Sequence, residues 1–287
     1  EERRRGMIEK ASGIHLTPCA KVNLYLAVKP PRADGYHPII SVFQTADLRD
    51  RLTILPSASG QLELEVTGIS IPADKTNILD KAYTAFQALR PEVPPLKIHL
   101  HKQIPVQAGL GGGSADAGCL LRYLADRYAP ELENEALIEA AAGVGADVPF
   151  FLTGGTCLVQ GLGEKITPMA DMQESPLLIF HPRVPVSTIE AYRGLDQLDN
   201  WSAPSVEHML KAIESGKAAG AGEHLFNSFE RWVYSKHPLL AQIKEFCLSQ
   251  GFQGTLLSGS GSNIFVLHEE AALSRLQDLA RERFPEV

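Results

Sequence analysis

The sequence predicts an α+β fold in which strands and helices are mixed without strict alternation. Residues 20–28 alternate between apolar and other side chains, which is the period of a strand. Residues 114–128 repeat apolar side chains every three to four positions, which is the period of an amphipathic helix. Because strand-like and helix-like segments follow one another irregularly, a doubly wound sheet of βαβ units fits less well.

The N-terminal half is expected to hold most of the strands. In residues 20–28, one face should carry Val22, Leu24, Leu26 and Val28, and the other Lys21, Asn23 and Tyr25. Further strands are expected at residues 39–46, 51–55, 61–66 and 96–100. A helix over residues 77–89 should end before Pro91.

After the helix at residues 114–128, a second helix at about 133–142 should end at glycines. Residues 155–160 and 176–180 have the pattern of strands. Residues 254–267 predict a strand, a Gly/Ser turn and a strand, before a closing helix at 269–283. A boundary near residue 175 divides the chain into expected domains at 14–174 and 175–287.

The composition excludes several classes of protein. The 287 residues are 44% hydrophobic and 21% charged, as in globular proteins. The formal net charge of −7 argues against nucleic-acid binding. No apolar run approaches the roughly 20 residues of a membrane span, and the charged first residues lack the apolar middle of a signal peptide. We expect a cytoplasmic monomer or weak homodimer without a membrane partner, and we assign no metal ligand.

A glycine-rich loop is the strongest functional signal. Four glycines in five residues allow the backbone to approach a ligand closely, and the loop leads into a helix N-terminus, which favours a polyphosphate. Ser114 is expected either to cap that helix or to contact a phosphate. Members of the loop, all candidate ATP contacts, are Pro105, Val106, Gln107, Ala108, Gly109, Leu110, Gly111, Gly112, Gly113, Ser114 and Ala115.

Two familiar nucleotide motifs do not fit this loop. It lacks the lysine of GxxxxGK[ST], and it lacks the last glycine of GxGxxG. A flexible surface turn is the alternative, although so much glycine costs ordering entropy. A second Gly/Ser turn, residues 257–262, is either a plain hairpin or a turn that packs beneath the loop.

One carboxylate lies in an apolar segment, residues 145–151. Buried carboxylates are rare unless they are paired. Asp147 is therefore either a helix N-cap ahead of Pro149 or a base that takes the proton of an acceptor hydroxyl. Lys21 is the expected partner, and it would bring positive charge to a phosphoryl group in transfer.

Together these segments resemble the GHMP kinase superfamily. The specific features are residues 20–24 (Ala-Lys-Val-Asn-Leu), 34–37 (Asp-Gly-Tyr-His), 41–44 (Ser-Val-Phe-Gln) and 47–48, followed in order by the glycine loop, residues 145–151 and residues 258–262. The resemblance covers most of residues 17–267 and is weakest at about 187–226. It departs from the family pattern at Ala115, where a second serine is common, and at Gly118, where alanine is usual.

The resemblance implies two lobes with a cleft between them, an N-terminal ribosomal-protein-like lobe that binds ATP and a C-terminal ferredoxin-like lobe. It implies that Lys21 and Asp147 are the catalytic pair. Asn77 falls where the family approaches the adenosine. The residues that match the cytidine end of the substrate are Asn23, Tyr36, His37 and, more loosely, Tyr192.

The activity implied is ATP-dependent phosphorylation, with Mg²⁺, of the 2-hydroxyl of a small cytidine diphosphate substrate that carries methylerythritol. An alternative within the superfamily is a homoserine, mevalonate or sugar kinase, against which residues 34–37 argue. A catalytically inactive nucleotide-binding module is the alternative from another class, and the presence of both Lys21 and Asp147 argues against it.

Overall fold

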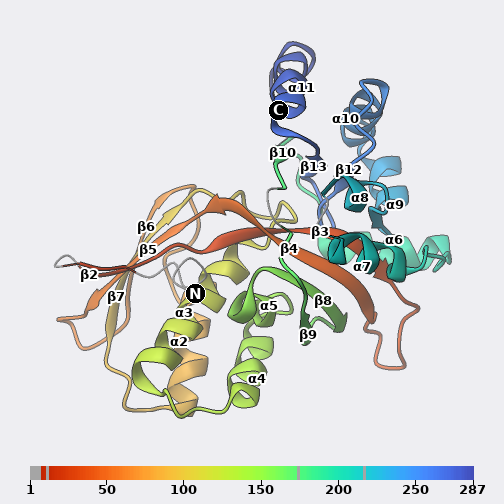
Figure 1. Ribbon diagram of the computed structural model, residues 1–287. Coiled ribbons are helices and arrows are strands. Elements are labelled where there is room, and N and C mark those ends of the chain that lie inside the picture. Colours follow the sequence, from red (N-terminus) through yellow and green to blue (C-terminus); the bar gives the residue numbers. More distant parts are fainter. Residues whose placement is uncertain (1–7, 11–12, 173–174, 216–217) are drawn as a thin grey trace.

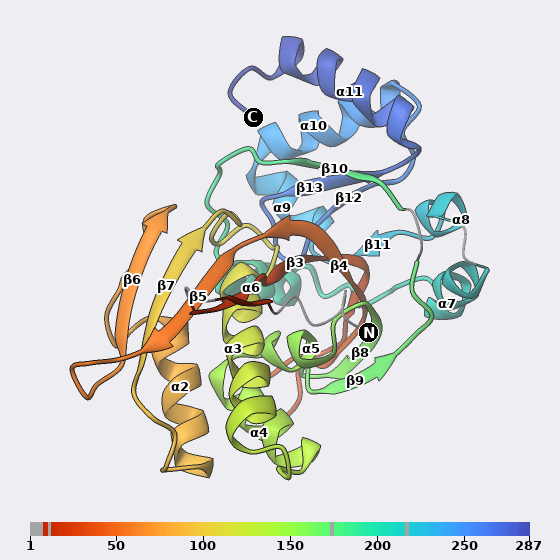
Figure 2. The same cartoon turned by 60° about the vertical axis from the view of Figure 1, so that its left-hand side comes forward.

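The computed structural model describes residues 8–10, 13–172, 175–215 and 218–287 (Figures 1 and 2). The described strands are β1 (Ile8–Lys10), β2 (Gly13–Leu16), β3 (Cys19–Val28), β4 (Ile39–Arg49), β5 (Arg51–Pro56), β6 (Glu63–Gly68), β7 (Leu96–Lys102), β8 (Thr156–Gly161), β9 (Lys165–Pro168), β10 (Leu177–Phe180), β11 (Phe226–Asn227), β12 (Thr255–Leu257) and β13 (Ile264–Leu267). The mixture of helices and sheets confirms the expected α+β class.

The helices lie mostly after the first strands. They are α2 (Ile78–Leu89), α3 (Gly112–Tyr128), α4 (Asn134–Val144), α5 (Val148–Thr153), α6 (Thr188–Leu198), α7 (Val206–Glu214), α8 (Ala218–Gly222), α9 (Glu230–Lys236), α10 (Pro238–Ser249) and α11 (Glu270–Arg283). In the described part of the chain, no helix combines the length and the apolar character needed to cross a membrane.

One sheet and three helices form the part of the molecule that holds the glycine loop. The sheet has the order β1-β2-β5-β7-β6, and α2, α3 and α4 gather against it (Figure 2). Apolar side chains of β5 and β7, such as Leu52 and Ile98, are buried with Phe86 of α2 and Leu120 of α3. This core fixes where β7 ends and α3 begins, and therefore the two ends of the loop.

A second sheet joins distant parts of the chain. Its order is β11-β3-β4-β8-β9, and β11 pairs with β3 in parallel, Phe226 opposite Tyr25. The third sheet, β10-β13-β12, carries α10 and α11 on the far side from the first sheet (Figure 1). The long strands β3 and β4 therefore run between the loop-bearing core and the C-terminal elements.

The expected faces of β3 are wrong beyond Leu24. The register of β3 against β4 shifts between Asn23 and Tyr25, because a β-bulge inserts an extra residue there. Each later side chain therefore changes face: Tyr25 is buried with Leu24 in one apolar cluster, whereas Leu26 joins Val28 in another. Lys21 and Asn23 keep the common face that the sequence predicts, and Leu26 is added to it.

The expected helices and strands are present, with ends that differ by a few residues. The short helix α5 was expected only under the alternative that makes Asp147 an N-cap, because its six residues are too few to show a helical period. The packing of α5 against α3 explains why residue 118 is glycine where the family usually has alanine. A Cβ at residue 118 would lie 2.6 Å from the Cβ of Phe151 in α5. Glycine at this position of α3 allows the two helices to approach closely.

Candidate active site

The glycine loop takes a left-handed backbone at alternate positions. The φ angles are 52° at Gln107, 76° at Gly109 and 66° at Gly111, which is the N-cap of α3. The first intrahelical hydrogen bond runs from the Ala115 N–H to the Gly111 carbonyl, 2.8 Å. Earlier N–H groups of the first turn therefore lie at the open end of the helix, where an anion can bind.

Ser114 does not cap α3. The helix begins two residues before it, and the N-cap is Gly111, which makes no side-chain capping bond. The alternative that Ser114 is the cap is therefore wrong, and its hydroxyl is left in the first helical turn.

The turn at residues 258–262 connects β12 to β13 and also packs against the loop. The Ser258 hydroxyl donates to the Gly109 carbonyl, 2.9 Å, and the Asn263 N–H donates to the Ala108 carbonyl, 3.3 Å. A Cβ on Gly109 would lie 1.9 Å from the Ser258 carbonyl oxygen. Both alternatives for this segment are therefore correct, because the turn closes a hairpin and also packs against the glycine loop. The close contact requires glycine at residue 109.

We expect Gly109→Ala to lower the free energy of unfolding by about 2–4 kcal/mol, since it combines a left-handed alanine with an overpacked contact. Gly60→Ala is the matched control, because Gly60 has the same φ of 76° but nothing within 4 Å of its added Cβ. That control should lose only about 1–2 kcal/mol. Equal denaturant midpoints for the two variants would contradict the close packing of loop and turn.

Lys21 is a buried cation beside the loop. Its side chain extends from β3, and the residue is only 3% exposed. Its Nζ donates to the Asn23 Oδ1, 2.7 Å, and lies 4.7 Å from the centroid of the Phe43 ring. Its backbone N–H donates to the Leu110 carbonyl, 2.9 Å. The same residue is thus fixed to the glycine loop and points its charge into the adjoining space.

Asp147 faces Lys21 from the other side of that space. It occupies the N-cap position of α5, with Pro149 in the first turn, but its side chain makes no capping hydrogen bond. Instead its Oδ2 lies 3.4 Å from the Lys21 Nζ, and a third of the side chain is exposed. The carboxylate is therefore available to a ligand.

A cavity of about 650 Å³ contains these groups. Lys21, Asn23 and Asp147 line it together with Gln107, Gly109 and Gly111 of the loop. Residues 185–190, Tyr192 and residues 259–261 also line it. The sequence singled out Tyr192 and the turn but not the N-terminus of α6, where Ser187 is the N-cap and the Thr188 Oγ1 contacts the Ser260 Oγ at 2.8 Å. The pair Ser187-Thr188, which precedes a segment with helical periodicity, could have indicated this helix N-terminus.

Of the residues expected at the cytidine end, Asn23 and Tyr192 line this cavity, and His37 contacts Tyr192. The His37 ring lies between those of Tyr192 and Trp201, with centroids 5.2 and 5.3 Å away. Its Nδ1 donates to the Lys29 carbonyl, 3.0 Å, and its Nε2 is 3.4 Å from the Asp196 Oδ1. Burial, with a smaller contribution from Asp147, raises the pKa of Tyr192 to about 12, so its hydroxyl stays neutral.

Three expected site residues are either exposed at the protein surface or hydrogen-bonded to neighbouring protein groups. Tyr36 is 63% exposed, next to His37 in the chain. Asn23 holds Lys21 and donates to the Ser41 Oγ, 3.1 Å. Asn77 caps α2 through Leu79 and donates to the Pro72 carbonyl, 2.6 Å, so both ends of its amide are occupied. Trp201, whose ring contacts that of His37, was not predicted as a site residue.

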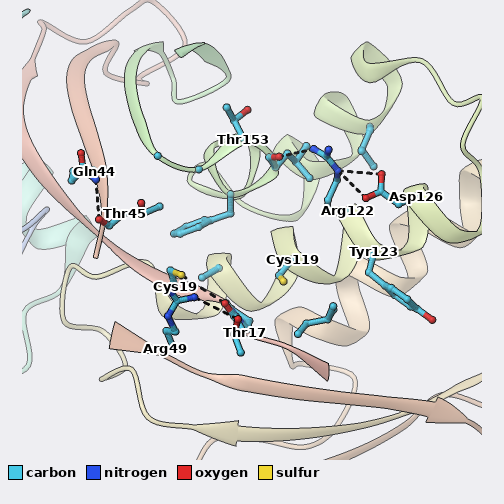
Figure 3. Close-up of a pocket in the computed structure, with 18 of the residues that line it drawn as sticks. Thr17, Cys19, Gln44, Thr45, Arg49, Cys119, Arg122, Tyr123, Asp126 and Thr153 are labelled. Atoms are coloured by element: carbon cyan, nitrogen blue, oxygen red, sulfur yellow. Dashed lines mark hydrogen bonds and ion pairs between the residues drawn. The ribbon is translucent and has the colours of Figure 1, made fainter. Parts of the chain in front are cut away.

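A larger cavity, about 750 Å³, lies between α3, α5 and the start of β3 (Figure 3). Among the expected site residues it contains only Ala115. Its arginines are already paired: Arg122 with Asp126, 3.2 Å, and Arg49 with Asp47. The buried cation, the carboxylate that it contacts and the glycine loop therefore meet in the smaller cavity and not in this one.

The chain matches two family models, "GHMP kinases N terminal domain" over residues 77–155 and "GHMP kinases C terminal" over residues 209–286. A protein of Clostridium kluyveri named 4-diphosphocytidyl-2-C-methyl-D-erythritol kinase is 38% identical over 93% of this chain and 96% of its own. One of the same name from Exiguobacterium sibiricum is 37% identical over 87% of each chain.

Solved structures give the same result. A crystal structure of 4-(cytidine 5'-diphospho)-2C-methyl-D-erythritol kinase aligns with a TM-score of 0.76 and 32% identity, covering 93% of this chain and 95% of that one. The L. major mevalonate kinase aligns with a TM-score of 0.72 but only 17% identity, which shows a common fold. The chain therefore belongs to the GHMP kinase family, and within it to the group of the 4-diphosphocytidyl-2-C-methyl-D-erythritol kinases.

Proposed function

We propose that the protein transfers the γ-phosphoryl group of ATP to the 2-hydroxyl of 4-diphosphocytidyl-2-C-methyl-D-erythritol, in the non-mevalonate route to isoprenoid precursors. The observation that carries this proposal is the pairing of Lys21 with Asp147 in the cavity lined by the glycine loop. The names of the relatives support the choice of acceptor.

In this reaction the acceptor oxygen attacks the γ-phosphorus, its proton passes to a carboxylate, and ADP leaves. Asp147 is the proposed proton acceptor, because its Oδ2 faces the cavity and makes no capping bond. Lys21 is proposed to stabilise the charge on the phosphoryl oxygens in transfer. The open N–H groups at the start of α3 are proposed to hold the β- and γ-phosphates.

Mg²⁺ is proposed to enter with ATP as part of the substrate. Among the described residues, no group of three or more His, Cys, Asp or Glu side chains is placed to hold a metal ion. Mg²⁺ on a nucleotide needs no such cage, since phosphates and waters supply most of its ligands. Asp147 and the Ser114 hydroxyl are oxygen donors near the loop that fit this role, and Ala115 offers none.

The two lobes are proposed to divide the binding. Residues 14–174 would bind ATP, and residues 175–287 would close the cleft. The two family models fall on either side of this boundary, at 77–155 and 209–286. The cytidine end of the acceptor would bind at Tyr36, His37 and Tyr192, with Asn23 near the transferred group. Asn77 is proposed to lie beside the adenosine, since a Cβ added to Gly113 of the loop would lie 3.5 Å from the Cγ2 of its neighbour Ile78.

A panel of acceptor alcohols with labelled ATP tests the choice of substrate. We expect transfer to 4-diphosphocytidyl-2-C-methyl-D-erythritol and none to homoserine, mevalonate or galactose. Transfer to one of the other alcohols would place the protein elsewhere in the superfamily. Binding of ATP without transfer to any acceptor would favour an inactive nucleotide-binding module.

Tyr192→Ala tests the proposed cytidine site. We expect KM for the acceptor to rise roughly ten- to hundredfold, because stacking on an aromatic ring is worth about 1–3 kcal/mol per base. KM for ATP should not change. Tyr192→Phe is the matched control, since it keeps the ring that faces His37. An equal rise in both KM values, or a normal acceptor KM in the alanine variant, would remove Tyr192 from the cytidine site.

A further inference from the structure

A buried cluster of three charged side chains lies beneath the glycine loop, and the mechanism above does not use it. Its members are Lys102, at the end of β7, Asp50, between β4 and β5, and Asp116, in α3; each is at most 1% exposed. The Lys102 Nζ donates to Asp50 and, at 2.8 Å, to the Asp116 Oδ2. Burying such a set is unfavourable unless its hydrogen bonds are well made.

The Asp50 side chain holds the entrance of the loop. Its Oδ1 accepts hydrogen bonds from the backbone N–H groups of Gln103, 2.5 Å, and Ile104, 2.9 Å, immediately before Pro105. Its own N–H donates to the Pro18 carbonyl, 3.0 Å, just before β3. Asp50 thus connects the start of the loop to the strand that carries Lys21.

The Asp116 side chain holds the exit of the loop. Asp116 lies one helical turn after Gly112, the first residue of α3. The Lys102 ammonium lies directly under that first turn, because a Cβ on Gly112 would be 3.0 Å from the Nζ. Lys102 therefore connects both ends of the loop through two hydrogen bonds to carboxylates.

Within the cluster, Asp116 shares the Lys102 ammonium with a second buried carboxylate, Asp50. Burial, and next to it the Asp50 carboxylate, raise the pKa of Asp116 well above its usual range, although Lys102 opposes the shift. Its second oxygen, Oδ1, is buried and has no hydrogen-bond partner among the described residues. The hydrogen bond from the Lys102 ammonium to Oδ2 is therefore the contact that holds the Asp116 carboxyl in its buried position.

We propose that Lys102, Asp50 and Asp116 form a clasp that holds the entrance and the exit of the glycine loop at the spacing a triphosphate requires. The three are positioning residues for the nucleotide, since none lines the cavity that holds Lys21 and Asp147. This inference rests on the proposed kinase function, because it assumes that the loop binds ATP.

The test separates ATP binding from acceptor binding. Asp116→Ala removes the hydrogen bond from Lys102 to α3, at the exit of the loop. We expect KM for ATP, and Kd for an ATP analogue measured by calorimetry, to rise about tenfold. The acceptor KM should not change, because Asp116 does not line the cavity that Asn23 and Tyr192 border. Asp116→Asn keeps an oxygen for the Lys102 ammonium and no charge, so it should restore most of the affinity for ATP.

Lys244→Met is the control, because it breaks a different ion pair, the partly buried pair of Lys244 and Glu230 at 2.5 Å, in the C-terminal part of the chain. It should change stability without changing KM for ATP. If Asp116→Ala does not fold, Asp116→Leu removes the same hydrogen bond while filling its space, and the same rise is expected.

The clasp is contradicted if the alanine or leucine variant binds the ATP analogue like the wild type. It is equally contradicted if KM for ATP and for the acceptor rise together, or if Lys244→Met weakens ATP binding as much. Failure of the proposed function would look different: the wild-type protein itself would transfer no phosphate to the acceptor, whatever its affinity for the nucleotide.

Discussion

Asp147→Ala should lower kcat by about 10²–10⁴-fold, the range lost with a general base. The carboxylate is the acidic group that faces Lys21 across the cavity, and it makes no capping bond to α5. Its removal therefore takes away the proton acceptor while leaving the helix N-terminus intact. The expected change in the free energy of unfolding is small, since a third of the side chain is exposed.

The measurement is kcat at saturating ATP and acceptor, together with a thermal unfolding curve. Asp126→Ala is a suitable control, because Asp126 is an exposed acid of α3 that pairs with Arg122 at 3.2 Å. It should keep full activity. Near-normal turnover in Asp147→Ala would exclude this residue from proton transfer, and loss of the folded state would make its role structural.

Lys21→Met should lower kcat by about 10²–10³-fold, comparable to removing one preorganised donor in an active site. The methionine keeps the apolar stem that packs near Gly111, where an added Cβ would lie 3.1 Å from the Lys21 Cγ. It removes the ammonium that contacts Asn23 and Asp147. The loss should therefore appear in turnover more than in folding.

Single-turnover rates with bound ATP measure this effect on the chemical step. Lys165→Met, on the exposed side of β9, is the control and should react like the wild type. Lys21→Arg should not recover activity, because a guanidinium is larger than the ammonium in the space between Gly111 and Phe43. A methionine variant with wild-type single-turnover rates would contradict the proposed role of the charge.

The parts of the site that local patterns determine could be predicted. The four glycines marked the loop, and the alternation of residues 20–23 placed Lys21 and Asn23 on one face. The alternation failed after Leu24, because a bulge depends on how β3 pairs with β4 and leaves no period in the chain. Lys21 and Asp147 lie 3.4 Å apart. Their pairing was predicted from their residue types and from the resemblance to a family, because the sequence separation of two distant residues does not show whether they meet in space.

The clasp shows what sequence reasoning missed although a signal was present. In β7 the buried positions are Leu96, Ile98 and Leu100, and the same alternation places Lys102 on the buried face. A lysine there requires buried acidic partners, but Asp50 and Asp116 reach it only through the tertiary fold. Trp201 was missed for a similar reason, because its contact with His37 depends on the path of a loop.

The most direct test of the account is a structure of the protein with a non-hydrolysable ATP analogue and 4-diphosphocytidyl-2-C-methyl-D-erythritol. The account predicts the γ-phosphate at the N–H groups that open α3, beside the Lys21 ammonium. It predicts the acceptor 2-hydroxyl within about 2.6–3.2 Å of an Asp147 oxygen. A nucleotide bound elsewhere, such as the larger cavity of Figure 3, or an acceptor hydroxyl out of reach of Asp147, would contradict it.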